Sequence, residues 1–205
     1  MKSKTRVLVE CAMMVALATV LSLVKIYEAP LGGSVTLFSM VPLLVVSYRH
    51  GFKWGARSAL VFSVLKILLG VGTISYVPTV TGIVLCVIFD YVFAYSAPAV
   101  AAFFRVKNAG SRKSRMVRAV LGALAACIFR FAAHFLSGAV VWYELTKQGE
   151  WNEYVKTVGM WTYSAVYNAQ FMIPESILVL IAVPFVVIAL EKIGRMGDMR
   201  MDSVR

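Results

Sequence analysis

Long apolar runs restrict the fold of this chain more than any other feature of its sequence. The hydrocarbon core of a bilayer is about 30 Å thick, and a helix needs about 20 apolar residues to cross it. Six stretches approach or exceed this length, at residues 7–26, 35–50, 54–71, 78–104, 117–141 and 161–190. We therefore predict a single all-α integral membrane domain over residues 1–205, with six transmembrane helices.

The composition agrees with a membrane protein. Hydrophobic residues make up 60% of the 205 residues and charged residues only 15%, whereas soluble domains average about 45–50% and about 25%. A soluble fold of this size would lack the polar side chains to cover its surface, which excludes most soluble enzyme classes. Cys11, Cys86 and Cys127 lie within apolar runs without a C-x-x-C spacing, so we expect packing residues rather than a disulfide or redox site.

The basic residues gather on alternate loops. One set of loops and both termini carry most of them: Lys2, Lys4, Arg6, Arg49, Lys53, Arg57, Arg105, Lys107, Arg112, Lys113, Arg115, Arg118, Lys192, Arg195, Arg200 and Arg205. The opposite loops hold only Lys147 and Lys156, beside four glutamates. Cytoplasmic loops are enriched in Lys and Arg, so we predict that both termini are cytoplasmic. The same rule accounts for the net charge of +11 without a nucleic-acid partner.

A few titratable side chains lie inside the predicted spans: Glu10, Lys66, Asp90, Arg130, His134 and Glu175. A charge at the centre of a membrane helix costs about 2.5–3.5 kcal/mol, so each calls for an explanation. Glu10 lies one turn from the cytoplasmic end and is expected to reach the interface or to pair with a basic loop. For Arg130, one interpretation is a buried ion pair with Glu175 or Asp90. We assign Arg130, Glu175 and Lys66 to a structural charge network.

The fifth predicted span carries a polar stripe. Arg130, His134, Gly138 and Trp142 follow one another at intervals of four residues, so they lie along one slowly drifting helix face. A face with these side chains is expected to meet protein or water rather than lipid. Gly138 lets another backbone or a ligand come close.

Aromatic residues concentrate at the outer ends of the spans. An interfacial aromatic belt explains Trp151 and Tyr154, but it explains less well why all tryptophans except Trp54 lie on the outer side. Aromatic faces beside a carboxylate bind flat organic cations through cation–π attraction and ion pairing. The residues that form such a site, if the helices converge, are Asp90, Trp142, Tyr163, His134 and Asn168.

The first span contains a pair of small residues, Ala12 and Ala16, whose spacing lets helices approach closely and indicates a helix–helix contact. Several motifs are absent from the sequence. Without G-x-x-x-x-G-K-[ST] the chain does not bind ATP in the P-loop manner, and it has neither H-E-x-x-H nor G-x-S-x-G. Six short spans without an evident inverted repeat also argue against a free-standing secondary transporter.

The ordered set of these features resembles the substrate-binding S-components of energy-coupling factor (ECF) vitamin transporters, and among them the thiamine-specific S-component. The resemblance covers nearly the whole chain. Its pieces are the Ala12/Ala16 pair, Gly32-Gly33-Ser34-Val35-Thr36-Leu37, Asp90-Tyr91, Arg130-Phe131-Ala132-Ala133-His134 through Ser137-Gly138 to Trp142, Tyr163-Ser164, Tyr167-Asn168 and Pro174-Glu175.

The resemblance implies a six-helix bundle in a prokaryotic plasma membrane that binds thiamine from outside, without a cofactor, a metal or a catalytic residue of its own. By this likeness, Asp90 takes the aminopyrimidine, and His134 and Trp142 enclose the rings of the vitamin. The remaining substrate contacts are Tyr91, Gly138, Tyr163 and Asn168. Ala12 and Ala16 match the face that docks on a transmembrane coupling subunit, which works with two cytosolic ATPases.

Two departures from the family pattern keep other interpretations open. Thiamine members often have Glu where this chain has Asp90, and a His-Pro-Val-Gln-like stretch where it reads Tyr76-Val77-Pro78-Thr79-Val80. An S-component for another small vitamin or for a thiamine precursor is therefore an alternative. From other classes, the alternatives are an intramembrane enzyme that uses His134 with Asp90 or Glu175, and a structural protein with internal charge pairs.

Overall fold

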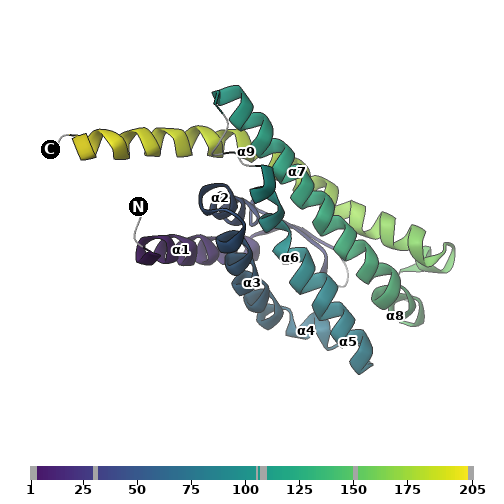
Figure 1. Cartoon of the computed structure of the whole chain (residues 1–205). Coiled ribbons are helices and arrows are strands. Elements are labelled where there is room, and N and C mark those ends of the chain that lie inside the picture. The colour runs from purple at the N-terminus through teal and green to yellow at the C-terminus, as the bar shows by residue number, and fades with distance from the viewer. Residues whose placement is uncertain (1–3, 30–31, 105, 107–109, 150–151, 203–205) are drawn as a thin grey trace.

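The computed structural model describes residues 4–29, 32–104, 106, 110–149 and 152–202, with side chains as far as residue 190 and at residue 192 (Figure 1). Some of the basic residues and aromatics singled out from the sequence lie outside this description: Lys2, Arg105, Lys107, Trp151 and Arg205, and the side chains of Arg195 and Arg200. Almost all of the described chain is helical, as the apolar runs predict.

In the described ranges, four helices are long and apolar enough to cross a membrane: Lys4–Leu23, Val80–Phe104, Arg112–Gln148 and Met160–Leu190. The first is α1 (Lys4–Leu23), and the second joins α5 (Val80–Cys86), the π-helix η2 (Val87–Phe93), α6 (Ala94–Ser96) and the 3₁₀-helix η3 (Ala97–Phe104). The third joins α7 (Arg112–Ser137), the π-helix η5 (Gly138–Trp142) and α8 (Tyr143–Gln148), and the fourth belongs to α9 (Met160–Asp202). The shorter elements are β1 (Lys25–Glu28), β2 (Ser34–Thr36), α2 (Val41–His50), α3 (Phe52–Leu69), α4 (Val71–Ile74) and η6 (Glu153–Lys156).

The long helices are apolar on their outward faces as well as their inward ones. Helix α1 buries Val7, Cys11 and Val15 against the rest of the chain, yet Leu8 and Met13 on its other side are more than half exposed. A helix that is hydrophobic all round belongs in a core or in lipid, because water would not solvate its outer face. The described chain is therefore built as an integral membrane protein.

The second predicted span is wrong in its boundaries. Residues 35–50 do not form one helix: Ser34–Thr36 pair as β2 with β1 in an antiparallel hairpin, and α2 runs only from Val41 to His50. Pro42 lies in the first turn of α2, where its fixed φ and missing N–H favour a helix start. Ten residues rise about 15 Å, half the thickness of the bilayer core. The first predicted span, 7–26, is also too long at its end, because Lys25 and Ile26 belong to β1.

Helix α3 is the other short span. Gly51, at a φ of 78°, turns the chain from α2 into α3, and α3 then continues for 18 residues, about 27 Å. It carries Lys53, Arg57 and Lys66, and it is not among the four helices that meet the length and hydropathy of a span. The described residues thus contain four such helices where the sequence predicts six.

Small side chains hold the long helices close together. Helix α7 packs along α9 and η3, and its buried face there is made of Ala119, Gly122, Ala123 and Ala126. A Cβ on Gly122 would lie 3.1 Å from the carbonyl oxygen of Ala101. Membrane helices approach through small residues because lipid offers them no hydrophobic driving force. The three cysteines are buried free thiols, as the sequence predicts, and Cys127 belongs to this packed cluster.

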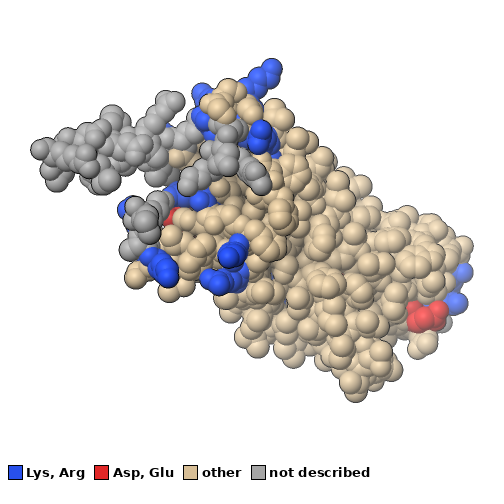
Figure 2. Space-filling model, viewed as in Figure 1, with Lys and Arg blue, Asp and Glu red and all other residues tan. Residues whose placement is uncertain are grey.

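The charged side chains gather at one end of the molecule. Figure 2 shows Lys and Arg over the end where α1 and α7 begin, while the far end beside α8 carries few charges. At the basic end, Glu10 Oε1 lies 2.8 Å from Arg49 Nε and Glu10 Oε2 lies 3.2 Å from His50 Nε2. The predicted pairing of Glu10 with a basic loop is confirmed, and it ties α1 to the end of α2.

Candidate functional site

A cavity lies where the hairpin, η2, α7 and α9 converge. The residues that line it include Lys25, Glu28 and Gly33 of the hairpin region, Lys66 and Gly70 at the end of α3, Asp90, Tyr91 and Tyr95 of η2 and α6, Arg130, His134, Gly138 and Trp142 of α7 and η5, and Tyr167, Asn168 and Phe171 of α9. Its volume is about 140 Å³, whereas one water needs about 10–15 Å³ on the same scale. The cavity therefore has room for a small organic molecule.

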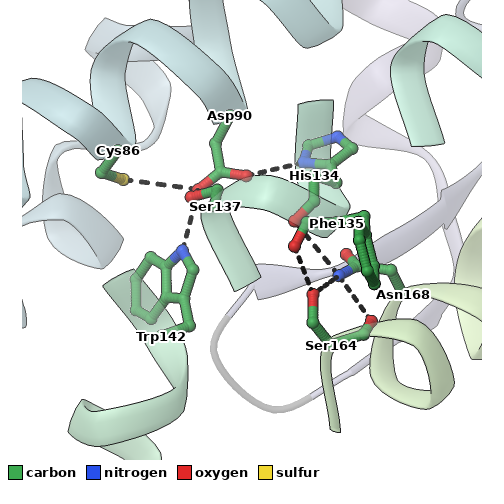
Figure 3. Close-up of polar contacts among 8 residues, drawn as sticks. All are labelled: Cys86, Asp90, His134, Phe135, Ser137, Trp142, Ser164 and Asn168. Atoms are coloured by element: carbon green, nitrogen blue, oxygen red, sulfur yellow. Dashed lines mark hydrogen bonds and ion pairs between the residues drawn. The ribbon is translucent and has the colours of Figure 1, made fainter. Parts of the chain in front are cut away.

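Asp90 is the centre of a hydrogen-bond network on one wall of this cavity (Figure 3). Its Oδ1 lies 2.7 Å from His134 Nδ1. Its Oδ2 accepts hydrogen bonds from Ser137 Oγ at 2.5 Å and Trp142 Nε1 at 2.8 Å, and from the Cys86 thiol at 3.6 Å. A carboxylate that is this well satisfied is held in one orientation, and it holds His134 and Trp142 in turn.

Two π-helical turns make this convergence possible. Ser137 and Trp142 are five residues apart and both reach Asp90 Oδ2. In a regular α-helix, residues five apart point well away from each other. The chain is π-helical over Gly138–Trp142, and the wider i→i+5 turn brings such residues onto one side. Asp90 itself lies in the other π-helix, Val87–Phe93.

Gly138 brings α9 close to this wall. A Cβ at Gly138 would lie 2.8 Å from Asn168 Nδ2 and would also overlap Ser164 Oγ. Asn168 Nδ2 donates to the carbonyl oxygen of His134 at 3.2 Å and to that of Ser164 at 2.9 Å. Ser164 Oγ donates to the carbonyl oxygen of Phe135 at 2.6 Å. The predicted close approach at Gly138 is thus made by α9 itself, which places Asn168 in the cavity wall.

Tyr163 does not line the cavity. Its side chain is 1% exposed, and its hydroxyl lies 3.0 Å from Thr146 Oγ1. The ring of Tyr167 stacks on it at a centroid distance of 5.7 Å and lines the cavity in its place. The sequence pattern identified the correct face of α9 but a residue one turn away from the one that lines the cavity. Tyr163 and Tyr167 are four residues apart, and residues with this spacing lie on the same helix face.

A second wall carries the buried positive charges. Arg130 Nη1 lies 3.0 Å from Glu175 Oε2, and both side chains are almost fully buried. Thr36 Oγ1 donates to Glu175 Oε1 at 2.6 Å. The predicted pair of Arg130 with Glu175, rather than with Asp90, is present. Lys66 and Arg130 both lie near the ring of Tyr95. The Lys66 ammonium is 5.6 Å from the ring centroid and the Arg130 guanidinium is 5.2 Å from it.

The hairpin closes the cavity over these two walls. Gly33 packs against Phe171 so tightly that a Cβ would lie 2.5 Å from the ring, so only glycine fits the hairpin to α9. Lys25 and Glu28 form an ion pair of 2.5 Å on the hairpin's exposed strand and line the rim. Gly32, Gly33 and Ser34, which belong to the stretch that resembles the family, therefore line the site.

Several residues of the site escaped the sequence prediction: Tyr95, Tyr167, Phe171 and the hairpin rim, which line the cavity, and Ser137, which donates to Asp90 from behind its wall. One signal could have found two of them. Tyr163, Tyr167 and Phe171 recur at intervals of four, and their rings contact in series at 5.7 and 5.9 Å. This aromatic stripe faces the polar stripe of α7. In the described ranges, no group of three or more His, Cys, Asp or Glu residues is placed to hold a metal ion.

The chain has clear relatives. A profile of the family described as "Thiamine transporter protein" matches residues 8–194. The thiamine transporter ThiT of Bacillus subtilis (strain 168) is 29% identical over 178 residues, which are 83% of this chain and 84% of the relative. A solved structure of ThiT from Listeria monocytogenes shares the fold, with a TM-score of 0.72 and 21% identity over 93% of this chain and 98% of that one. Because the family profile covers nearly the whole sequence, the chain belongs to the thiamine transporter protein family.

Proposed function

We propose that this chain is the thiamine-binding S-component of an ECF-type importer. Its family membership makes it a transport protein rather than an enzyme, so the intramembrane-enzyme interpretation of His134 is set aside. The observation that carries the proposal is the cavity in which the Asp90 carboxylate meets the Trp142 indole, with further aromatic rings around them.

The chemistry of this cavity suits thiamine. The vitamin carries a permanently positive thiazolium ring and a flat aminopyrimidine. Asp90 supplies the negative charge, and the faces of Trp142, Tyr91, Tyr167 and Phe171 supply surfaces for planar rings and for cation–π attraction. We place the vitamin against the wall formed by Asp90, His134, Gly138, Trp142 and Asn168, with Tyr163 supporting Tyr167 from behind.

Other vitamins fit this wall less well. An anionic ligand such as biotin would be repelled by Asp90, and its best partner on the opposite wall is Lys66, because Arg130 is already paired with Glu175. A flavin would need a larger apolar slot than this cavity of about 140 Å³. A thiamine precursor that retains the aminopyrimidine is the closest alternative, and the binding experiment below includes this competitor.

The surface and the charges support a proposal for the partners. Ala12 and Ala16 are exposed on α1, whereas Ala18 is buried inside the chain. We propose that the Ala12/Ala16 face docks on a transmembrane coupling subunit driven by two cytosolic ATPases. We further propose six membrane-embedded helical segments in a prokaryotic plasma membrane, with the basic end in Figure 2 and both termini on the cytoplasmic side.

A fluorescence titration tests the proposed function. Purified protein in detergent is expected to bind thiamine saturably with a change in tryptophan emission, and biotin and riboflavin are expected to leave the emission unchanged. In Trp142→Phe most of the emission change is lost, since this indole lines the cavity. In the control Trp161→Phe it remains, because Trp161 is half exposed on the outer surface. Absence of saturable binding would contradict the proposal, and tighter binding of the aminopyrimidine precursor alone would favour the alternative.

A further inference from the structure

Lys66 is a charged side chain of the cavity that the proposed contacts with thiamine do not use. It lies on the second wall, and its ammonium is 3.5 Å from Ser22 Oγ, a long hydrogen bond, and 5.6 Å from the centroid of the Tyr95 ring. No carboxylate of the described residues lies within ion-pair distance of this ammonium. A lysine ammonium carries several donors and no acceptor, and a charge removed from water needs an opposite charge beside it. Lys66 therefore has unused capacity to bind.

Arg130 adds an unused donor to the same wall. Its side chain is 4% exposed and lines the cavity. Nη1 lies 3.0 Å from Glu175 Oε2, but Nε has no hydrogen-bond partner among the residues that the structure describes. The guanidinium lies 5.2 Å from the centroid of the Tyr95 ring, which the Lys66 ammonium also approaches. A buried donor without a partner calls for an acceptor, and two cationic groups beside one ring favour an acceptor with a negative charge.

The charges of the cavity balance only while it holds no cation. The ion pair at the hairpin rim and the ion pair on the second wall are each neutral. Of the charged residues described around the cavity, this leaves the Asp90 carboxylate and the Lys66 ammonium, which cancel. A bound cation neutralises Asp90 and leaves Lys66 as an excess positive charge, and protonation of His134 would add to that excess. An uncompensated charge away from water is costly.

We propose that Lys66 and Arg130 bind a small inorganic anion beside the vitamin, so that a cation and an anion occupy the cavity together. Lys66 supplies the charge and Arg130 Nε supplies a directed hydrogen bond. This inference rests on the proposed function, because the excess charge arises when the ligand is a cation. The linkage is reciprocal: an anion that raises the affinity for thiamine is itself bound more tightly, by the same factor, when thiamine is present.

A comparison of two salts tests this linkage on the wild-type protein. Calorimetric titrations with thiamine are made in potassium chloride and in potassium gluconate, whose anion is bulky, at the same ionic strength. Matching the ionic strength keeps the screening of surface charges equal. Chloride is expected to raise the thiamine affinity about 10-fold, within the usual range for coupling between two sites. Equal affinities in the two salts would overturn the inference.

The variant Lys66→Met removes the charge and keeps an unbranched side chain. It is expected to bind thiamine equally in both salts, and in gluconate more tightly than the wild-type protein, because the repelling ammonium is gone. A purely structural role of Lys66 would weaken binding instead. The matched control Lys147→Met removes an exposed lysine that does not line the cavity, and it keeps the chloride effect. If the chloride effect persists in Lys66→Met, the anion binds elsewhere and the assignment is wrong.

Bromide locates the anion without any variant. In crystals of the wild-type protein grown with thiamine and bromide, anomalous scattering is expected to place a bromide ion within contact of Lys66 Nζ and Arg130 Nε. Thiamine in the cavity without bromide at this wall would contradict the proposal.

Two other ways to balance the charge give different results. If Lys66 loses its proton when the cation binds, titrations in buffers of different ionisation enthalpy report a released proton in the wild type and none in Lys66→Met. If chloride has no effect and thiamine monophosphate binds more tightly than thiamine, an advantage that Lys66→Met removes, the negative charge comes with the ligand. Either result overturns the inference and leaves the proposed function intact. Absence of thiamine binding in both salts would contradict the proposed function itself.

Discussion

Replacing Ala12 or Ala16 by tryptophan is expected to abolish thiamine uptake and to leave thiamine binding unchanged. Both alanines lie on the exposed face of α1, and neither lines the cavity. A bulky side chain there prevents a second helix from approaching, but a surface change away from the core alters the folded protein by about 0.5 kcal/mol or less, about a twofold effect on binding.

Uptake and binding are measured separately for this prediction. Uptake uses cells without another thiamine importer that express the chain together with its coupling subunits, and binding uses the purified chain. The matched control is Leu17→Trp, which puts the same ring on the neighbouring residue, about 100° around α1 and also exposed. It is expected to transport. Equal uptake by all three variants would show that this face does not dock, and a parallel loss of binding would show misfolding.

Removing one partner of the Arg130–Glu175 pair is expected to cause the largest loss of stability. Both side chains are buried, at 4% and 2% exposure, so Arg130→Met leaves the Glu175 carboxylate without its counter-charge and with Thr36 as its remaining donor. Breaking a buried ion pair costs about 3–5 kcal/mol. In a chain of this size, each kcal/mol lowers the melting temperature by about 2–4 °C.

The double variant separates charge from packing. Arg130→Met with Glu175→Leu removes both charges, and replacing a whole buried pair by apolar side chains is often neutral. It is therefore expected to melt well above Arg130→Met alone. Thermal unfolding in detergent gives the comparison. If the double variant melts as low as the sum of the two single variants predicts, the two side chains act independently and the pair is not an energetic unit.

The sequence alone predicted those parts of the site whose residues recur with the period of an α-helix. The spacing of Arg130, His134, Gly138 and Trp142 predicted one face, and the structure places all four on the cavity. The apolar runs likewise predicted the long helices to within a few residues at most ends. Both signals depend only on local geometry, since a 3.6-residue repeat and a minimum length decide them.

The prediction failed where the chain departs from regular helix. Residues 35–40 are apolar enough to extend a span, but their backbone forms β2 and the turn before α2. The π-helical turns at Val87–Phe93 and Gly138–Trp142 have no simple sequence pattern, so the meeting of Ser137 and Trp142 on one oxygen could not be anticipated. Helix periodicity also predicts Tyr163 and Tyr167 equally well as cavity residues. The structure distinguishes them, because the Tyr163 hydroxyl is buried against Thr146.

A structure determined with thiamine bound tests the central claim most directly. We expect the vitamin inside the cavity beneath the hairpin, beside Asp90 and His134 and with a ring against Trp142, while Asp90 keeps its contacts to Ser137 and Trp142. Thiamine located outside this cavity, or held within it on the Lys66 and Arg130 side with its rings away from Asp90 and Trp142, would contradict the account.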